Sequence, residues 1–294
     1  MIWTNHDTWI AITAAITAMA CVIPGVFLVL SRQSMMSHGV AHAVLPGIVV
    51  SFLIMHEREM VSMLVGAILA AVLTGALTRF FQTFGKVEPG AALGIAFTTL
   101  FAIGLVLVRL FADYAHIEPS HVLFGSLEMS VFGEGTPPPI AVRSAIMLLG
   151  NLILTILFFK ELKIATFDPE LASSLGFRPQ WVQYGVMSVT ATTAVIAFES
   201  VGSILVIAMM IAPPATAFLL TKDLKKLIAL SLFIAAATSI LGHVMSIRGF
   251  GAITASIFRL EPVGSTNTAG GMAIVSGLLF LAVLFLKRQR QIEI

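Results

Sequence analysis

Residues 160–180 read KELKIATFDPELASSLGFRPQ, a polar segment between two long apolar runs. The flanking runs are suited to lipid, whereas this segment carries lysines, glutamates and an aspartate. A membrane protein that holds such a segment in a loop presents a surface on which a soluble partner can act. This organisation favours a driven transporter over a passive pore.

The middle of this segment carries the signals of a short helix. Asp168 suits the N-cap, Pro169 the first helical position and Gly176 the stop. Leu171 and Leu175 would then lie on one apolar stripe. So short a stripe would hold only weakly to a bilayer, and we therefore expect it to dock into a groove of another protein.

The composition is that of a membrane protein. Of the 294 residues, 58% are hydrophobic and 11% charged, whereas soluble domains have about 25% charged residues. The single cysteine, Cys21, excludes a disulfide framework or a cysteine-based metal cluster within one chain. The stretch Ala18-Met19-Ala20 before it resembles a cleavage site, but no lysine or arginine precedes it, so a first membrane helix is expected rather than a signal peptide.

Apolar runs of about 20 residues predict membrane-crossing helices. The expected fold class is therefore all-α: a polytopic integral membrane helical bundle of about nine spans, or eight, in a single domain, residues 1–294. Glu199 and Gly202 lie where two spans would join, and Pro213-Pro214 interrupts the second of these. Such breaks persist at membrane depth only where protein or a water-filled cavity covers the freed backbone groups. The nine candidates are residues 9–30, 39–55, 60–80, 91–111, 141–159, 181–198, 201–220, 227–246 and 269–286.

The positions of lysine and arginine predict the orientation. With the N-terminus outside, twelve of the 17 fall inside and five outside, so the C-terminus and residues 160–180 are expected in the cytoplasm. The longest segment between spans, residues 112–139, is then external, with a short helix expected at about 121–127 on the outer face. The inner residues are Arg32, Arg79, Lys86, Lys160, Lys163, Arg178, Lys222, Lys225, Lys226, Lys287, Arg288 and Arg290, and the outer ones are Arg58, Arg109, Arg143, Arg248 and Arg259.

Two histidines open the second predicted span. His38 and His42 are four residues apart and share a helix face. Two imidazoles at this spacing can contact a divalent transition metal. They can also simply bond backbone carbonyls in a packed bundle. The nearby Pro46-Gly47 break favours the metal contact.

Two further ionisable residues lie in apolar surroundings. Glu199 is the only carboxylate between Trp181 and Leu220, and acids within membrane segments usually face a cavity or a partner. The alternative is a hydrated residue at an outer helix end. His243, near the end of the eighth predicted span, fits either a structural role or a place on a metal path.

Nucleotide-binding motifs are absent from the sequence. It has no G-x-x-x-x-G-K-[ST] loop and no G-x-G-x-x-G after a predicted strand. If ATP drives the protein, another subunit must bind it, and we expect no bound cofactor on this chain. An intramembrane enzyme is the least favoured class, because no nucleophile–base pair is suggested and H-E-x-x-H is missing.

Several motifs resemble the permease subunits of the zinc/manganese/iron family of ABC importers, in order over nearly the whole chain. These motifs are HAVLPG at 42–47, FGSL at 124–127, DPELAxxLG at 168–176, VGSILVIAMMIAPPATA at 201–217 and TAGGMAIVSGLLFL at 268–281. The motif at 268–281 is most like the manganese/iron branch of the family.

The resemblance implies a non-catalytic, multi-pass permease of the bacterial inner (plasma) membrane, surrounded by lipid, that imports manganese, zinc or iron and binds no nucleic acid. It would pair with a second permease as a homo- or heterodimer, bind two cytoplasmic ATPases and receive metal from an extracytoplasmic binding protein. His42 matches the family's pathway histidine. The coupling helix that docks on the ATPase would comprise Asp168, Pro169, Glu170, Leu171, Ala172, Leu175 and Gly176.

One motif departs from the family pattern. The family usually has GDALSHAVLPG, whereas this chain places His38 at the aspartate and Ala41 at the serine. If the aspartate helps a hard cation to pass, His38 would shift preference towards zinc or iron; if it is a packing position, nothing follows.

The leading hypothesis is an ATP-driven permease for a divalent metal ion, with His42, Glu199, His38 and His243 along the path in descending order of expectation. One alternative is the same architecture carrying a metal chelate such as a siderophore or cobalamin. Another is an ion-coupled secondary transporter, which would need internal symmetry and a carboxylate relay, and Glu199 is the only candidate for such a relay.

Overall fold

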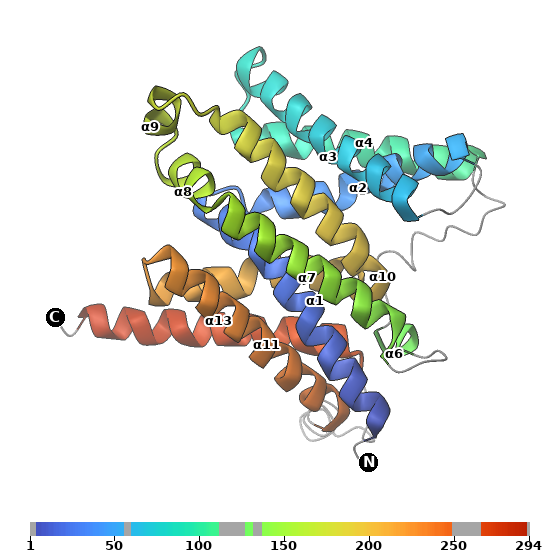
Figure 1. Ribbon diagram of the computed structural model, residues 1–294, viewed down its shortest axis with the longest axis vertical. Helices are drawn as coiled ribbons and strands as arrows, with labels where there is room; N and C mark the ends of the chain where they lie inside the picture. The colour runs from blue at the N-terminus through green and yellow to red at the C-terminus, as the bar shows by residue number, and fades with distance from the viewer. Residues whose placement is uncertain (1–3, 56–59, 112–126, 132–136, 249–265, 293–294) are drawn as a thin grey trace. The chain divides into compact units, whose positions relative to one another are not determined.

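The computed structural model describes residues 4–55, 60–111, 127–131, 137–248 and 266–292. Within these ranges the regular structure is helical (Figure 1). Nine helical segments there are long and apolar enough to cross a membrane, which confirms the predicted all-α membrane fold. They are Asn5–Leu30, Met35–Met55, Val61–Thr83, Pro89–Phe111, Pro139–Leu157, Pro179–Phe198, Val201–Leu220, Leu224–Ile247 and Thr268–Gln289.

The helix boundaries lie within a few residues of those expected. The first two spans differ most at their starts, since α1 begins at Asn5 rather than at residue 9 and α2 begins at Met35 rather than at residue 39. The earlier start of α2 places both histidines of the motif in the helix. In chain order the helices are α1 (Asn5–Leu30), α2 (Met35–Met55), α3 (Met60–Thr83), α4 (Pro89–Phe111), α6 (Leu127–Ser130), α7 (Pro139–Leu157), α8 (Phe159–Phe167), α9 (Pro169–Ser174), α10 (Pro179–Leu220), α11 (Leu224–Arg248) and α13 (Thr268–Ile292).

Two spans meet within α10, as the sequence predicts. Gly202 has φ 75° and ψ 167°, a non-helical conformation that separates them. The expectation that Pro213-Pro214 interrupts the second span was wrong, because the helix continues through both prolines. Pro214 cannot donate to the carbonyl of Met210, and that carbonyl lies against Gly25 of α1, where a Cβ atom would overlap it. Protein therefore covers the freed group.

The chain divides into two compact units. Unit 1 comprises Met1–Val26, Ser120–Leu154 and Ile196–Ile294, and unit 2 comprises Phe27–Pro119 and Thr155–Val195. In unit 1, α11 packs against α13. Polar bonds tie α7 to α1 in the same unit: the Thr17 hydroxyl donates to Ser144 Oγ at 2.9 Å and the Asn151 amide donates to the Ala20 carbonyl at 3.0 Å.

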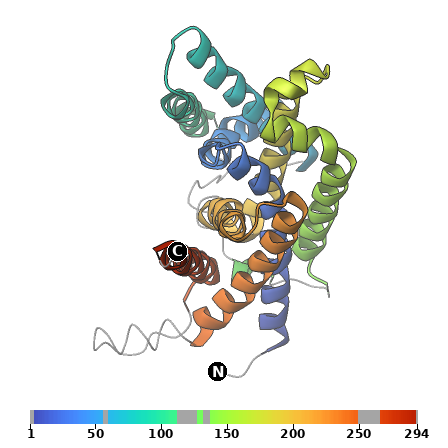
Figure 2. The ribbon, with the colours of Figure 1, turned by 90° about the vertical axis from the view of Figure 1, so that its left-hand side faces the viewer.

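Unit 2 is built around α2, α3 and α4, which pack against one another (Figures 1 and 2). Gly47 of α2 and Gly66 of α3 allow their backbones to touch, since a Cβ atom at either would overlap the carbonyl oxygen of the other. Such small residues are typical of close helix packing in membranes. One buried core cluster of the unit consists of Leu28, Met36, Val40, Val44, Ile48, Ala67, Ala71, Leu93, Met187 and Ala191, and a second one consists of Leu45, Val49 and Val108.

The polar segment 160–180 holds two short helices rather than the one expected. The additional helix, α8, begins directly after α7, and Phe158 at its N-cap makes no side-chain capping bond. Without a capping residue, its start had no sequence signal. The outer helix expected at about 121–127 lies outside the described residues except for Leu127, where the short helix α6 begins.

Candidate functional site

The histidine pair on α2 is brought together as predicted. The rings of His38 and His42 have centroids 4.5 Å apart and an interplanar angle of 76°. Both side chains are half-buried. Their i,i+4 spacing on a regular helix places the two imidazoles on one face, where both could contact one ion.

Aromatic rings of α4 flank this pair. Phe97 lies with its centroid 5.5 Å from that of His38, and Phe101 lies 5.3 Å from His42. Among the described residues, no group of three or more histidine, cysteine, aspartate or glutamate side chains could hold a metal ion. Two imidazoles make a weak site, and weak holding is what conduction requires, because a tightly ligated ion would not leave.

His243, in unit 1, lies in a buried polar cluster. Its Nδ1 is 3.1 Å from the hydroxyl of Thr268, at the start of α13, and its Nε2 is 4.0 Å from Oδ1 of Asp7, near the start of α1. The backbone N–H of Thr268 donates to Oε1 of Glu128 in α6 at 2.8 Å. The cluster therefore joins the ends of four helices. Sequence reasoning missed Asp7, Glu128 and Thr268 because these contacts link residues far apart in the chain.

Glu199 is placed only in part. Its backbone belongs to α10, three residues before the Gly202 break, whereas its side chain lies outside the described part of the chain.

The helix predicted from the DPELASSLG motif is confirmed as α9. Asp168 is its N-cap, and Oδ1 of Asp168 accepts a hydrogen bond from the backbone N–H of Leu171 at 2.9 Å. Pro169 occupies the first helical position, where its missing N–H costs nothing. The carboxylate also complements the partial positive charge of the helix start.

The end of α9 is a Schellman motif. The N–H of Phe177 donates to the carbonyl of Ala172 at 2.9 Å, and the N–H of Gly176 donates to that of Ser173 at 3.1 Å. Gly176 has φ 85°, in the left-handed region that favours glycine. The helix is thus fixed at both ends by local bonds.

Two leucine side chains are exposed on α9 and its C-cap. The exposed fractions of Leu171 and Leu175 are 48% and 57%, while Ala172 is fully buried. Phe167, just before the helix, is 56% exposed. This predicted stripe is therefore presented outward, where a partner can cover it.

Replacing Gly176 by alanine is expected to loosen α9 without removing it. No atom lies within 4 Å of an added Cβ, so the cost is that of the left-handed backbone, about 1 kcal/mol. Hydrogen exchange of the α9 amides should accelerate about fivefold. Gly176→Asn should accelerate the hydrogen exchange of these amides less, because asparagine tolerates the left-handed conformation. Equal exchange rates in the wild type and in Gly176→Ala would contradict the role of Gly176 in ending α9.

Comparisons with known proteins give consistent similarities. The sequence model of the ABC 3 transport family matches residues 7–261. The zinc transport system membrane protein TroD of Treponema pallidum is 38% identical over 93% of this chain and 72% of that protein. The manganese transport system membrane protein MntD of Bacillus subtilis is 35% identical over 81% of this chain and 83% of that protein. The solved structure of PsaBC from Streptococcus pneumoniae in complex with Fab matches with a TM-score of 0.75 and 25% identity, over 99% of this chain and 96% of that chain.

Proposed function

Because the chain belongs to the ABC 3 transport family and is the membrane permease of an ABC importer of divalent manganese, zinc or iron, we propose that α9 docks on the ATPase and that His42 and His38 contact the passing ion. The permease itself is not an enzyme. An ABC permease works with an ATPase and a binding protein, so ATP is bound and hydrolysed on a separate subunit. The transported metal ion is the cargo, and no cofactor is proposed on this chain.

The observation that carries the docking proposal is the outward apolar stripe of α9. Leu171 and Leu175 are exposed on a helix held at its start by Asp168 and at its end by Gly176. A helix fixed at both ends can transmit a displacement of the ATPase to the permease, whereas a flexible loop would deform instead. The sequence has no phosphate-binding loop of its own, so the force must come from a partner.

The proposed ion path is led by the histidine pair on α2. Its two imidazoles share one helix face, and the flanking rings of Phe97 and Phe101 are apolar. We propose Glu199 and His243 as further contributors. His243 is buried and bonded to Thr268, so its contribution includes holding helix ends in place.

We further propose a dimer of permeases with two ATPases, in the bacterial inner membrane. The excess of lysine and arginine on one side supports an external N-terminus, a cytoplasmic C-terminus and a cytoplasmic α9. In this arrangement the binding protein delivers metal to the outer face. The single domain expected for residues 1–294 would contain the whole path.

Metal uptake by proteoliposomes that hold the permease with its ATPase and binding protein is expected to depend on ATP. The ATPase drives the conformational cycle, so uptake of Mn²⁺, Zn²⁺ or Fe²⁺ should fall to background when ATP is replaced by a non-hydrolysable analogue. Vesicles without permease are the control. Uptake that proceeds equally without hydrolysis would contradict the proposed function.

A further inference from the structure

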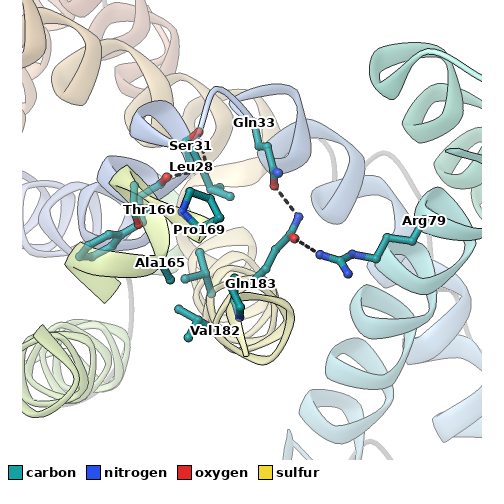
Figure 3. A pocket seen from close by; sticks show the side chains of 12 residues that line it. Leu28, Ser31, Gln33, Arg79, Ala165, Thr166, Pro169, Val182 and Gln183 are labelled. Atoms are coloured by element: carbon teal, nitrogen blue, oxygen red, sulfur yellow. Dashed lines mark hydrogen bonds between the residues drawn. The ribbon is translucent and has the colours of Figure 1, made fainter. Parts of the chain in front are cut away.

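Three segments of unit 2 are joined by one chain of side-chain hydrogen bonds. Nη2 of Arg79 donates to Oε1 of Gln183 at 2.7 Å, and Nε2 of Gln183 donates to Oε1 of Gln33 at 2.7 Å (Figure 3). Arg79 lies near the end of α3, Gln183 in the first turns of α10, and Gln33 just after α1. All three side chains are half-buried, where a lost partner costs more than it does in water.

The backbone at the end of α1 is shaped so that the side chain of Gln33 reaches Gln183. The N–H of Gln33 donates to the carbonyl of Leu28 at 2.8 Å, and that of Arg32 donates to Val29 at 3.1 Å, a Schellman motif. Arg32 has φ 57° at the position where glycine is usual. A non-glycine residue held in this conformation is strained, and such strain is found preferentially at functional positions.

The three hydrogen-bonded side chains also border a cavity at the base of α9. The cavity has a volume of about 250 Å³ and is lined by Pro169, the first residue of α9, as well as by Gln33, Arg79 and Gln183 (Figure 3). Ser31 and Thr166 add polar atoms to its wall. Pro169, at the start of α9, and the three bonded side chains therefore line the same cavity.

We propose that Gln33, Gln183 and Arg79 form a latch that holds the end of α1, the end of α3 and the start of α10 together, so that a displacement of α9 moves these three helix ends together. This inference rests on the proposed docking of α9 on the ATPase. Directional hydrogen bonds suit this task, because apolar side chains in contact can slide past one another. Gln183 is a positioning residue, because it acts through the two side chains that it links.

The test measures how many metal ions are imported per ATP hydrolysed by the complex in proteoliposomes. Gln183→Leu removes both bonds and should lower this ratio about tenfold, the scale of one lost charge-assisted hydrogen bond, while the ATPase stays bound and hydrolyses ATP. Gln183→Glu should retain most of the wild-type number of metal ions imported per ATP. Its carboxylate accepts from Arg79 and, once the amide of Gln33 turns over, from Gln33 as well.

Ser188→Ala is the matched control, because the Ser188 hydroxyl bonds only within α10, to the carbonyl of Tyr184 at 2.9 Å. The latch proposal would be overturned if Gln183→Leu imported the normal number of metal ions per ATP, or if Gln183→Glu lowered this number as much as Gln183→Leu does. If Gln183→Leu fails to reach the membrane, Gln33→Leu leaves the Arg79 bond intact and should give an intermediate ratio; a normal ratio there would also overturn it. Wild-type complex without ATP-dependent uptake would instead refute the proposed function, and the latch with it.

Discussion

Replacing Glu170 and Leu171 together by alanine is expected to abolish ATP-driven metal uptake while folded permease remains in the membrane. The side chain of Leu171 is 48% exposed on α9, and covering a leucine contributes about 1.5–3 kcal/mol. Its loss alone should therefore weaken ATPase binding about 10- to 100-fold. Glu170 lies in the first helical turn, where a negative charge is favourable.

The measurement is co-purification of the ATPase with the permease in detergent, followed by uptake in vesicles. Leu149→Ala provides a matched control, because Leu149 is 58% exposed in α7 and belongs to a membrane span. That variant should bind the ATPase normally. Normal coupled uptake in the double variant of α9 would rule out the assignment of this helix as the docking element.

The spans could be predicted because their signal is local. Twenty apolar residues are needed to cross a bilayer whatever the neighbouring helices are, and each predicted span has its counterpart in the structure. The caps of α9 were predictable for the same reason, since Asp168 and Gly176 bond to backbone groups within a few residues. The start of α8 has no such cap, and it therefore could not be detected from local sequence.

The side-chain links between helices could not be predicted. Nothing near Gln183 in the sequence indicates that it bonds Gln33 and Arg79, which lie 150 and 104 residues away. The polar neighbours of His243 were missed for the same reason. Contacts of this kind depend on which helices pack together, whereas the facing of His38 and His42 follows from helix periodicity alone.

The two histidines of α2 are expected to respond differently to substitution. His42→Ala should lower uptake of every transported metal about tenfold or more, as expected if the contact is worth at least 1.4 kcal/mol. Phe97→Leu is the control, because Phe97 flanks the pair and offers no ligand atom. Uptake at the wild-type rate in His42→Ala would show that His42 does not belong to the proposed ion path.

His38→Asp restores the carboxylate that the family pattern has at this position, and it should change preference rather than rate. Carboxylate oxygens suit manganese, whereas imidazole suits zinc and iron. The ratio of Mn²⁺ to Zn²⁺ uptake should therefore rise about tenfold, a change of about 1.4 kcal/mol in relative stabilisation. His38→Asn has nearly the same shape as the aspartate variant but no charge, so it separates ligand chemistry from packing. An unchanged ratio in His38→Asp, or an equal change in His38→Asn, would mean that the position is a packing contact in the helix pair α2 and α4, where His38 already meets Phe97.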